Sequence, residues 1–217
     1  MDEGIRHYYG GIIAEIKPAS PSEGDLYSGS IEELAKIYEE NGAGAISVLT
    51  NEKLFKGKLE NVTIAKNATK LPILMKDFIV SREHVDAGKK AGADIILIIL
   101  GTSPLELIDY THSLGLQVLL ETHTLEEFRQ AKKTNADFIG INNRNLKTME
   151  IDITNTIRIL GKEKPDRMIV SESGIKTRHD IEILENAGVS GFLVGTSLLK
   201  SKDVGAKLRE LLKNDSS

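Results

Sequence analysis

The sequence predicts an α/β protein folded as a single (β/α)8 TIM barrel, on three observations. Apolar runs that end in polar or charged residues recur along the chain, and strands buried on both faces of a parallel sheet read as continuous Val, Ile and Leu. Clusters of small residues precede several of these runs, which is typical of a helix that ends before a strand. The length of 217 residues suits one barrel domain.

Eight segments have the composition expected of buried strands. They lie near residues 11–17, 45–50, 72–78, 94–100, 117–122, 138–143, 168–172 and 191–195. The small-residue clusters that precede four of them are 42–45, 91–94, 135–137 and 187–190. An open doubly wound sheet is the alternative fold. Similar units repeated without a Gly-x-Gly-x-x-Gly turn favour the closed barrel.

The segments between the strands are predicted to be eight helices. Ser30 with Glu33 forms a capping-box pattern, and Leu34, Ile37 and Tyr38 then follow at helical spacing. Further predicted helix starts are Pro104, Thr124 and Thr177, and the last helix is predicted within 201–213. We expect one domain over residues 1–217, with a short N-terminal segment at 1–10 and a polar tail at 214–217.

Composition excludes several classes of protein. The formal net charge of −4 argues against a nucleic-acid-binding surface, and the absence of cysteine excludes disulfides and Cys-ligated metals. No His-x-His or His-Glu-x-x-His spacing occurs, so no metal site is expected. The N-terminus lacks a signal-peptide pattern, and the longest apolar run, Ile95 to Leu100, is too short to span a bilayer. We therefore expect a cytoplasmic protein that binds neither nucleic acid nor membranes, with a monomer as its simplest state.

The first strand ends in an acid and a cation. Glu15 and Lys17 are two residues apart on a strand, so both side chains point to the same side. One interpretation is an ion pair that plugs the barrel end, because buried charges are costly unless paired. The functional interpretation places both in the mouth, where (β/α)8 enzymes keep their active sites. Ser20 follows in a loop that can offer its hydroxyl to an anion.

Lys76 follows four apolar residues, and desolvating an ammonium group is expensive, so a purely structural role is disfavoured. We expect burial to lower the pKa of Lys76 toward values useful in acid–base chemistry. Asp77 has the opposite parity and is expected to face the helix layer or to pair locally. Phe78 and Phe55 are candidates for aromatic walls of a site, although a core position is the favoured interpretation for a lone phenylalanine.

Two later strands end in further candidates. Glu121 is a lone carboxylate after an apolar run, and His123 shares its parity. A Glu–His pair is one hypothesis, but a supporting or surface position for His123 is the favoured interpretation. Asn142 and Arg144 share one face after the next strand, and arginine suits bidentate binding of a carboxylate. The alternative is a turn rich in asparagine.

The last two strands are followed by glycine and hydroxyl residues. Loops after strands seven and eight, with a short helix N-terminus, form the usual phosphate site of a barrel. The candidate phosphate-binding residues here are Ser173, Gly174, Gly195 and Thr196.

Several motifs together resemble the indole-3-glycerol-phosphate synthase family. The most specific are Glu-x-Lys-x-x-Ser-Pro-Ser at 15–22 and Gly-Ile-Asn-Asn-Arg-Asn-Leu at 140–146. Others are 45–50, 74–79, 170–175 and 194–198. The resemblance runs in order from about residue 10 to about residue 200 and covers nearly the whole chain.

The resemblance implies an enzyme of tryptophan biosynthesis that needs no cofactor or metal. It implies closure of 1-(2-carboxyphenylamino)-1-deoxyribulose 5-phosphate to indole-3-glycerol phosphate, with release of carbon dioxide and water. Lys76 is then the general acid at the ribulose carbonyl, and Glu121 the acid–base group for dehydration, with Glu15 in support. Lys17 is a cation near the substrate carboxylate and the ring-closure centre.

The same resemblance assigns the binding residues. Asn142 and Arg144 position the substrate. The phosphate cradle comprises Ser20, Ser173, Gly174, Gly195 and Thr196. The family usually carries some forty residues before the first strand, which form an extra helix that helps to cover the anthranilate ring. Residues 1–10 can supply at most a turn or two, so we expect this helix to be largely missing.

Two rival functions stay open. Another phosphosugar enzyme on the same fold, such as phosphoribosylanthranilate isomerase, is disfavoured because that enzyme uses a Cys–Asp pair and this chain has no cysteine. A non-catalytic phosphate-binding barrel is disfavoured by the intact charged set, which would be a standing cost in stability.

Overall fold

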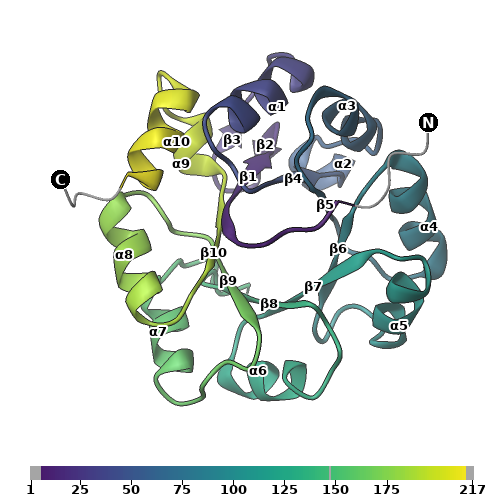
Figure 1. Ribbon diagram of the computed structural model, residues 1–217, viewed down its shortest axis with the longest axis vertical. Helices are drawn as coiled ribbons and strands as arrows, with labels where there is room; N and C mark the ends of the chain where they lie inside the picture. The colour runs from purple at the N-terminus through teal and green to yellow at the C-terminus, as the bar shows by residue number, and fades with distance from the viewer. Residues whose placement is uncertain (1–5, 147, 214–217) are drawn as a thin grey trace.

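A computed structural model describes residues 6–146 and 148–213, and within these residues eight parallel strands close into a barrel (Figure 1). The strands are β1 (Gly11–Ile16), β4 (Ala45–Leu49), β5 (Ile73–Lys76), β6 (Ile95–Ile99), β7 (Gln117–Thr122), β8 (Phe138–Asn142), β9 (Met168–Glu172) and β10 (Gly191–Val194). Each pairs in parallel with its neighbours along the chain, and β10 pairs with β1. The predicted (β/α)8 barrel is confirmed.

Helices surround the barrel and follow the strands in sequence. The longer ones are α1 (Ile31–Glu40), α3 (Glu60–Ala68), α4 (Arg82–Ala91), α5 (Glu106–Ser113), α6 (Leu125–Ala131), α7 (Thr154–Leu160), α8 (Arg178–Asn186) and α10 (Val204–Leu212). Predicted caps form at Ser30, Thr124 and Thr177, whose side chains accept backbone N–H groups. Helix α5 begins at Glu106, two residues beyond the predicted start at Pro104.

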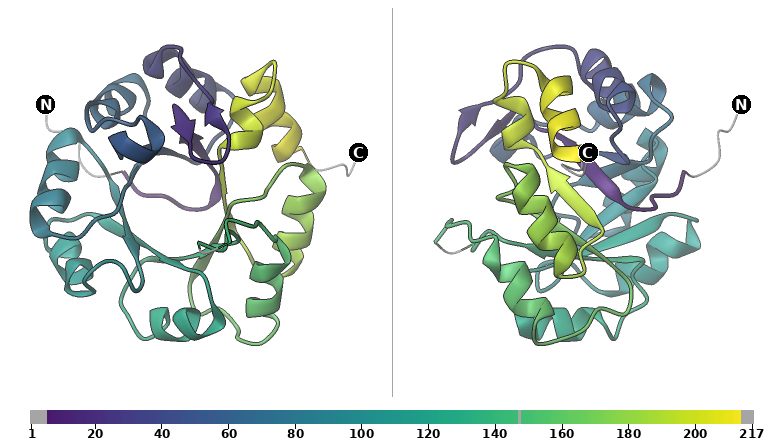
Figure 2. Two further views of the ribbon diagram at one scale, coloured as in Figure 1. Left: turned by 180° about the vertical axis from the view of Figure 1, so that it is seen from behind. Right: turned by 60° about the vertical axis from the view of Figure 1, so that its left-hand side comes forward.

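Short elements that the sequence did not predict lie in the loops at the carboxyl end of the barrel. They are the helices α2 (Glu52–Phe55) and α9 (Thr196–Leu199) and the antiparallel pair β2 (Ala19–Ser20) and β3 (Gly24–Asp25). Figure 2 shows the β2–β3 hairpin and the loop between β8 and α7 projecting from the same end of the barrel, with the chain that leads into β1 at the other end. The elements absent from the prediction are therefore those that shape the mouth.

Alternation of side chains divides the strands between two apolar regions. Inward-facing residues fill the barrel interior, because successive side chains on a strand point to opposite faces. The interior cluster comprises Tyr8, Ile13, Ala45, Leu74, Ile95, Leu97, Ile99, Leu119, Phe138, Val170 and Leu193. The alternate residues of the same strands, such as Ile12, Ile46 and Ile96, pack outward against the helices.

Residues 6–10 close the amino end of the barrel without forming a helix. Tyr8 is buried, its hydroxyl donates to the backbone oxygen of Gly11 at 2.7 Å, and its ring packs edge-on against Phe138. The buried carboxylate of Asp94 accepts the backbone N–H of Arg6 at 2.9 Å. The remainder of the predicted N-terminal segment, residues 1–5, and the predicted polar tail at 214–217 lie outside the described residues.

Candidate active site

Polar side chains form a layer at the carboxyl end of the barrel, directly above its apolar interior. On strand after strand, an interior apolar residue is followed two positions later by a polar residue or a glycine, which therefore faces the same way. These pairs are Ile13 and Glu15, Ala45 and Ser47, Leu74 and Lys76, Leu119 and Glu121, Val170 and Glu172, and Leu193 and Gly195. This polar layer comprises Glu15, Lys17, Lys76, Glu121, Asn142 and Glu172.

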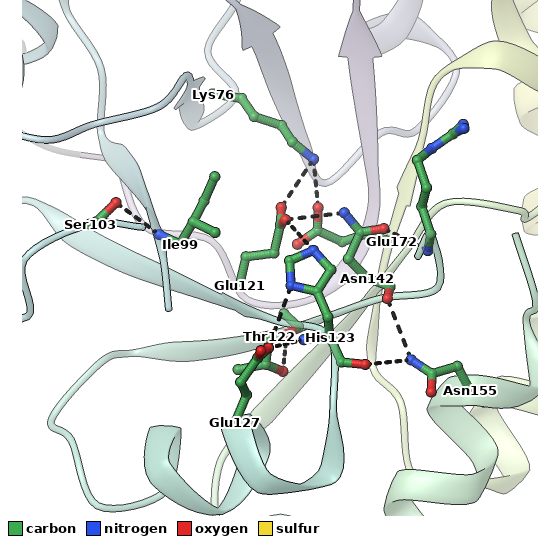
Figure 3. Close-up of polar contacts among 12 residues, drawn as sticks. Lys76, Ile99, Ser103, Glu121, Thr122, His123, Glu127, Asn142, Asn155 and Glu172 are labelled. Carbon is green, nitrogen blue, oxygen red and sulfur yellow. Dashed lines mark hydrogen bonds and ion pairs between the residues drawn. The ribbon is translucent and has the colours of Figure 1, made fainter. Parts of the chain in front are cut away.

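Lys76 lies at the centre of the polar layer, surrounded by carboxylates from three other strands. Its Nζ donates to Oε2 of Glu172 at 2.6 Å. The same Nζ lies 3.6 Å from Oε2 of Glu121 and 4.0 Å from Oε2 of Glu15. Figure 3 shows the side chains of Lys76, Glu121 and Glu172 converging from different strands.

The surrounding carboxylates reverse the expected pKa shift of Lys76. Burial alone lowers the pKa of this ammonium group, as the sequence predicted. The negative charges of Glu172, Glu121 and Glu15 outweigh that effect and raise the pKa of Lys76 above its ordinary value. The expectation of a lowered pKa was therefore wrong, and Lys76 is a protonated acid over the neutral pH range.

Glu15 and Lys17 form an ion pair, which was one of the two interpretations of these residues, and it connects the polar layer to the loop after β10. Nζ of Lys17 lies 2.7 Å from Oε1 of Glu15 and donates to Oγ1 of Thr196 at 3.3 Å. Burial opposes ionisation of Glu15, but Lys17 and Lys76 lower its pKa below the ordinary value. The pair thus combines the structural and functional interpretations, because it is buried and also faces the mouth.

Glu121 is held from several sides. Its Oε1 accepts a hydrogen bond from Nδ2 of Asn142 at 3.1 Å, and Nε2 of His123 lies 3.1 Å from the same oxygen. Burial alone would raise the pKa of Glu121, but Lys76 and then His123 lower it to about 2. Glu121 is consequently ionised at neutral pH and can accept a proton.

Glu172 belongs to the polar layer, and the sequence analysis did not select it. Its side chain is fully buried, and its Oε1 has no hydrogen-bond partner within residues 6–146 and 148–213. Burial, together with the charge of Glu121, raises the pKa of Glu172 to about 7, although Lys76 opposes the shift. Glu172 lies two residues after Val170 on an apolar strand, so the two side chains face the same way. This alternation could have identified Glu172 from the sequence.

Two glycines make room for these carboxylates. A Cβ atom on Gly140 would lie 2.4 Å from Oε1 of Glu172, and one on Gly195 would lie 2.4 Å from Oε1 of Glu15. The sequence predicted that Gly195 lets the backbone approach a phosphate. The structure adds that the space beside its Cα is occupied by Glu15.

The candidate phosphate-binding residues lie on adjacent loops after β9 and β10. Ser197 of α9 donates to the backbone oxygen of Ile175 at 2.9 Å, which ties these loops together. Ser173 and Gly174 both have positive φ, at 67° and 90°. Ser20 lies in β2, which follows β1, the strand paired with β10, and its buried hydroxyl has no hydrogen-bond partner among the described residues.

Arg144 and the two phenylalanines lie at the rim rather than in the polar layer. Nη1 of Arg144 donates to the backbone oxygen of Met149 in the β8–α7 loop at 3.2 Å. Phe78 is 40% exposed and Phe55 is partly exposed at the end of α2, so neither is a core residue and the favoured core interpretation was wrong. Asp77 pairs locally as predicted, accepting from the hydroxyl of Thr50 at 2.6 Å.

Within residues 6–146 and 148–213, no helix is long and apolar enough to cross a membrane. No group of three or more His, Cys, Asp or Glu side chains there is placed to hold a metal ion.

A buried lysine among carboxylates at the carboxyl end of a (β/α)8 barrel defines a barrel enzyme equipped for acid–base catalysis. The sequence model of the indole-3-glycerol phosphate synthase family matches residues 4–211, so the chain belongs to this family. The indole-3-glycerol phosphate synthase of Aquifex aeolicus is 48% identical over 207 residues, which cover 93% of this chain and 80% of that protein. One from Dehalococcoides mccartyi is 46% identical over 209 residues, covering 93% of this chain and 81% of that protein.

Solved structures with low sequence identity share the fold. A thiamine phosphate pyrophosphorylase from Pyrococcus furiosus has a TM-score of 0.70 at 18% identity, over 93% of this chain and 92% of that one. An N-acetylmannosamine-6-phosphate 2-epimerase from Clostridium perfringens has a TM-score of 0.64 at 18% identity, over 86% of each chain. These likenesses support the barrel architecture alone.

Proposed function

We propose that this protein converts 1-(2-carboxyphenylamino)-1-deoxyribulose 5-phosphate to indole-3-glycerol phosphate, with release of carbon dioxide and water. The observation that carries the proposal is the position of Lys76, held between Glu15, Glu121 and Glu172 at the mouth of a barrel of this family. The reaction needs proton donors and acceptors close together and calls for no cofactor or metal. The polar layer supplies both kinds of group.

Ring closure needs an acid at the ribulose carbonyl. The carbon–carbon bond forms between the ring carbon that bears the carboxylate and the carbonyl carbon, and the carbonyl oxygen takes up a proton. Lys76 is the proposed donor, because the surrounding carboxylates keep it protonated and it projects from the end of β5 into the mouth. Loss of carbon dioxide then restores the aromatic ring.

Dehydration needs both an acid and a base. The hydroxyl leaves as water after taking a second proton, and C1 of the ribulose chain gives up one proton. Each turnover therefore takes one proton from solvent. Glu121 is the proposed acid–base group because it is ionised at neutral pH, and Asn142 orients it. Glu172, with its pKa raised to about 7, is a proposed proton reservoir for Lys76.

The ends of the substrate are assigned by the charge and shape around the mouth. We place the phosphate at the loops after β9 and β10, with Thr196 beside it. Because Nζ of Lys17 donates to Oγ1 of Thr196, we assign Lys17 to the phosphate end of the substrate rather than to the substrate carboxylate that the family resemblance implies. The proposed phosphate cradle is Ser20, Ser173, Gly174, Gly195 and Thr196. Arg144 is the proposed partner of the substrate carboxylate, which can replace the backbone oxygen of Met149. Phe55 and Phe78 are the proposed aromatic walls for the ring.

The domain organisation, the oligomeric state and the location of the protein are proposed as well. Residues 1–217 form a single domain that acts on this small molecule as a monomer in the cytoplasm, without nucleic-acid or membrane partners. Membership of a biosynthetic family with a small-molecule substrate supports this view. Light scattering coupled to size-exclusion chromatography tests the monomer, and a mass twice that of the 23.8 kDa chain would contradict it.

An indole-fluorescence assay on purified protein tests the proposed activity. With the carboxyphenylamino-deoxyribulose phosphate as substrate, indole fluorescence should rise and carbon dioxide should be released in equal amount. Thiamine phosphate synthesis and sugar-phosphate epimerisation serve as control reactions, since proteins of those names share the fold. A folded protein that forms no indole product would refute the proposal.

A further inference from the structure

His123 lies behind the polar layer, with its ring between two carboxylates. Nε2 is 3.1 Å from Oε1 of Glu121, and Nδ1 is 3.5 Å from Oε2 of Glu127 on α6 (Figure 3). The side chain is 12% exposed, so the favoured interpretation of a supporting position holds and the surface position does not. The hypothesis of a Glu–His pair is also confirmed.

The backbone of His123 is held as firmly as its ring. Its N–H donates to Oε2 of Glu127 at 2.6 Å, and its carbonyl oxygen accepts from Nδ2 of Asn155 at 3.0 Å. Asn155, in the first turn of α7, also donates to the carbonyl oxygen of Asn142 at 3.4 Å. The ends of β7 and β8, which carry Glu121 and Asn142, are thereby linked through one amide.

Charged groups from three elements face the imidazole. They are Glu121 on β7, Glu127 on α6 and Glu172 on β9. Burial lowers the pKa of His123, but these carboxylates raise it above its ordinary value. A protonated ring donates from both nitrogens at once, which matches a carboxylate on each side.

We propose that His123, in its doubly protonated form and clamped by Glu127, is a positioning residue that orients the Glu121 carboxylate toward Lys76 and the substrate. Asn142 donates a hydrogen bond to Oε1 of Glu121, and Nε2 of His123 lies 3.1 Å from the same oxygen as an ion pair, without the alignment of a hydrogen bond. Oε2 is left facing Lys76. Loss of a proton from His123 removes one of its donors and one positive charge beside Glu121. The proposal rests on the proposed function, because it requires Glu121 to be the acid–base group.

Steady-state kinetics over a range of pH test the positioning role. His123→Leu should lower kcat by about 10-fold to 100-fold with little change in KM, as expected when a catalytic group is misplaced. His123→Gln keeps an amide donor for Oε1 and should recover most of that loss. Because glutamine does not titrate, this variant should also lose the alkaline decline of kcat that deprotonation of His123 causes. Glu127→Gln should move that decline to lower pH.

A second histidine–carboxylate pair provides the matched control. Nε2 of His112 lies 2.8 Å from Oδ2 of Asp137, which precedes β8 at the opposite end of the barrel. His112→Gln should leave the pH profile of kcat unchanged. A wild-type kcat in His123→Leu, or an unaltered alkaline decline in His123→Gln, would overturn the proposal. If His123→Leu does not fold, the glutamine variants at 123 and 127 decide the question.

Titration of the imidazole by NMR in substrate-free protein gives a readout that does not depend on activity. The pKa of His123 should exceed the ordinary value of 6.5 and should fall in Glu127→Gln and in Glu121→Gln. A pKa at or below 6.5 that neither variant changes would overturn the proposal. Absence of indole product from the wild-type protein would instead refute the proposed function.

Discussion

At the residue scale, the protonation state of Lys76 is decided by competition between burial and charge. Complete burial can shift a pKa by about 3–5, in the direction of the neutral form. Two unit charges about 4 Å apart interact by roughly 4 kcal/mol at an effective dielectric constant of about 20, which is equivalent to about three pKa units. Several carboxylates around one ammonium therefore outweigh the loss of solvation. Lys76 is suited to donate a proton rather than to accept one.

Replacing Lys76 by methionine tests that role. Lys76→Met keeps most of the side-chain volume and removes the proton donor, so activity should fall by about 100-fold or more. The variant leaves Glu121 and Glu172 buried without their shared cation, so its melting temperature should also fall, more at pH 8 than at pH 6. Lys36→Met, which removes an exposed ion pair to Glu32, is the control and should change neither property appreciably. Near-normal turnover in Lys76→Met would rule out the acid assignment.

The raised pKa of Glu172 predicts a pH dependence of stability. Its folded-state pKa of about 7 lies above the ordinary 4.5, so the folded protein binds more protons between these values and stability declines as pH rises. This decline amounts to roughly 3 kcal/mol for one such group. Glu172→Gln should therefore gain stability relative to the wild type between pH 5 and pH 8. Urea unfolding at each pH measures the difference, and a difference independent of pH would contradict the raised pKa.

At the scale of elements, strand parity brings the acid–base groups together, and glycines on neighbouring strands leave space for them. Glu15 on β1 occupies the space beside Gly195, just after β10, and Glu172 on β9 occupies the space beside Gly140 on β8. Each carboxylate therefore fits in its position only because the residue beside it on the neighbouring strand is a glycine, which has no side chain. The backbone does not require glycine at position 195, where φ is −127°.

A double-mutant cycle tests this packing. Gly195→Ala places a Cβ against Glu15 and should destabilise the protein by about 1–3 kcal/mol, with loss of activity as Glu15 and Lys17 shift. In a Glu15→Ala background the same substitution should cost less, because Oε1, the nearest atom at 2.4 Å, and Cδ are gone and only Cβ of residue 15 remains, at 3.1 Å. Chemical denaturation of the four proteins gives the coupling energy. Equal losses of stability in both backgrounds would show that the glycine at position 195 does not serve to make room for Glu15.

At the scale of the whole molecule, the two ends of the barrel have different tasks. Tyr8 and the buried Asp94 close the amino end, whereas the polar layer and the loop elements shape the carboxyl end. This division is the usual one in (β/α)8 enzymes, in which stability and chemistry are separated along the barrel axis.

Inorganic phosphate should stabilise the whole fold by binding between the loops after β9 and β10. A ligand at 100 times its Kd that binds only the folded state adds about 2.7 kcal/mol, so the melting temperature should rise with phosphate concentration. Sodium chloride at matched ionic strength controls for screening. Lys17→Met should weaken the response, while Lys58→Met, at an exposed position, should not. An equal response to chloride, or an undiminished one in Lys17→Met, would place the phosphate elsewhere.

Most of the barrel could be predicted from the sequence because its signals are local. The apolar runs, the capping residues Ser30, Thr124 and Thr177, and the small residues before strands each act over a few positions. The short helices α2 and α9 and the β2–β3 pair were missed because they have too few residues for a periodic pattern. The start of α5 shifted by two residues, which is within the ordinary uncertainty of a helix end.

The sequence alone determined the fold class, the family and most of the inward-facing polar residues, with Glu172 as the exception, since these follow from patterns along the chain. Only the tertiary structure decided the charge states and the partners of those residues. Three findings depend on atoms contributed by other strands. They are the raised pKa of Lys76, the hydrogen bond between Glu172 and Lys76, and the placement of Glu15 beside Gly195. Electrostatic and steric interactions act through space at distances of about 3–4 Å, and closure of the barrel brings those strands to that separation.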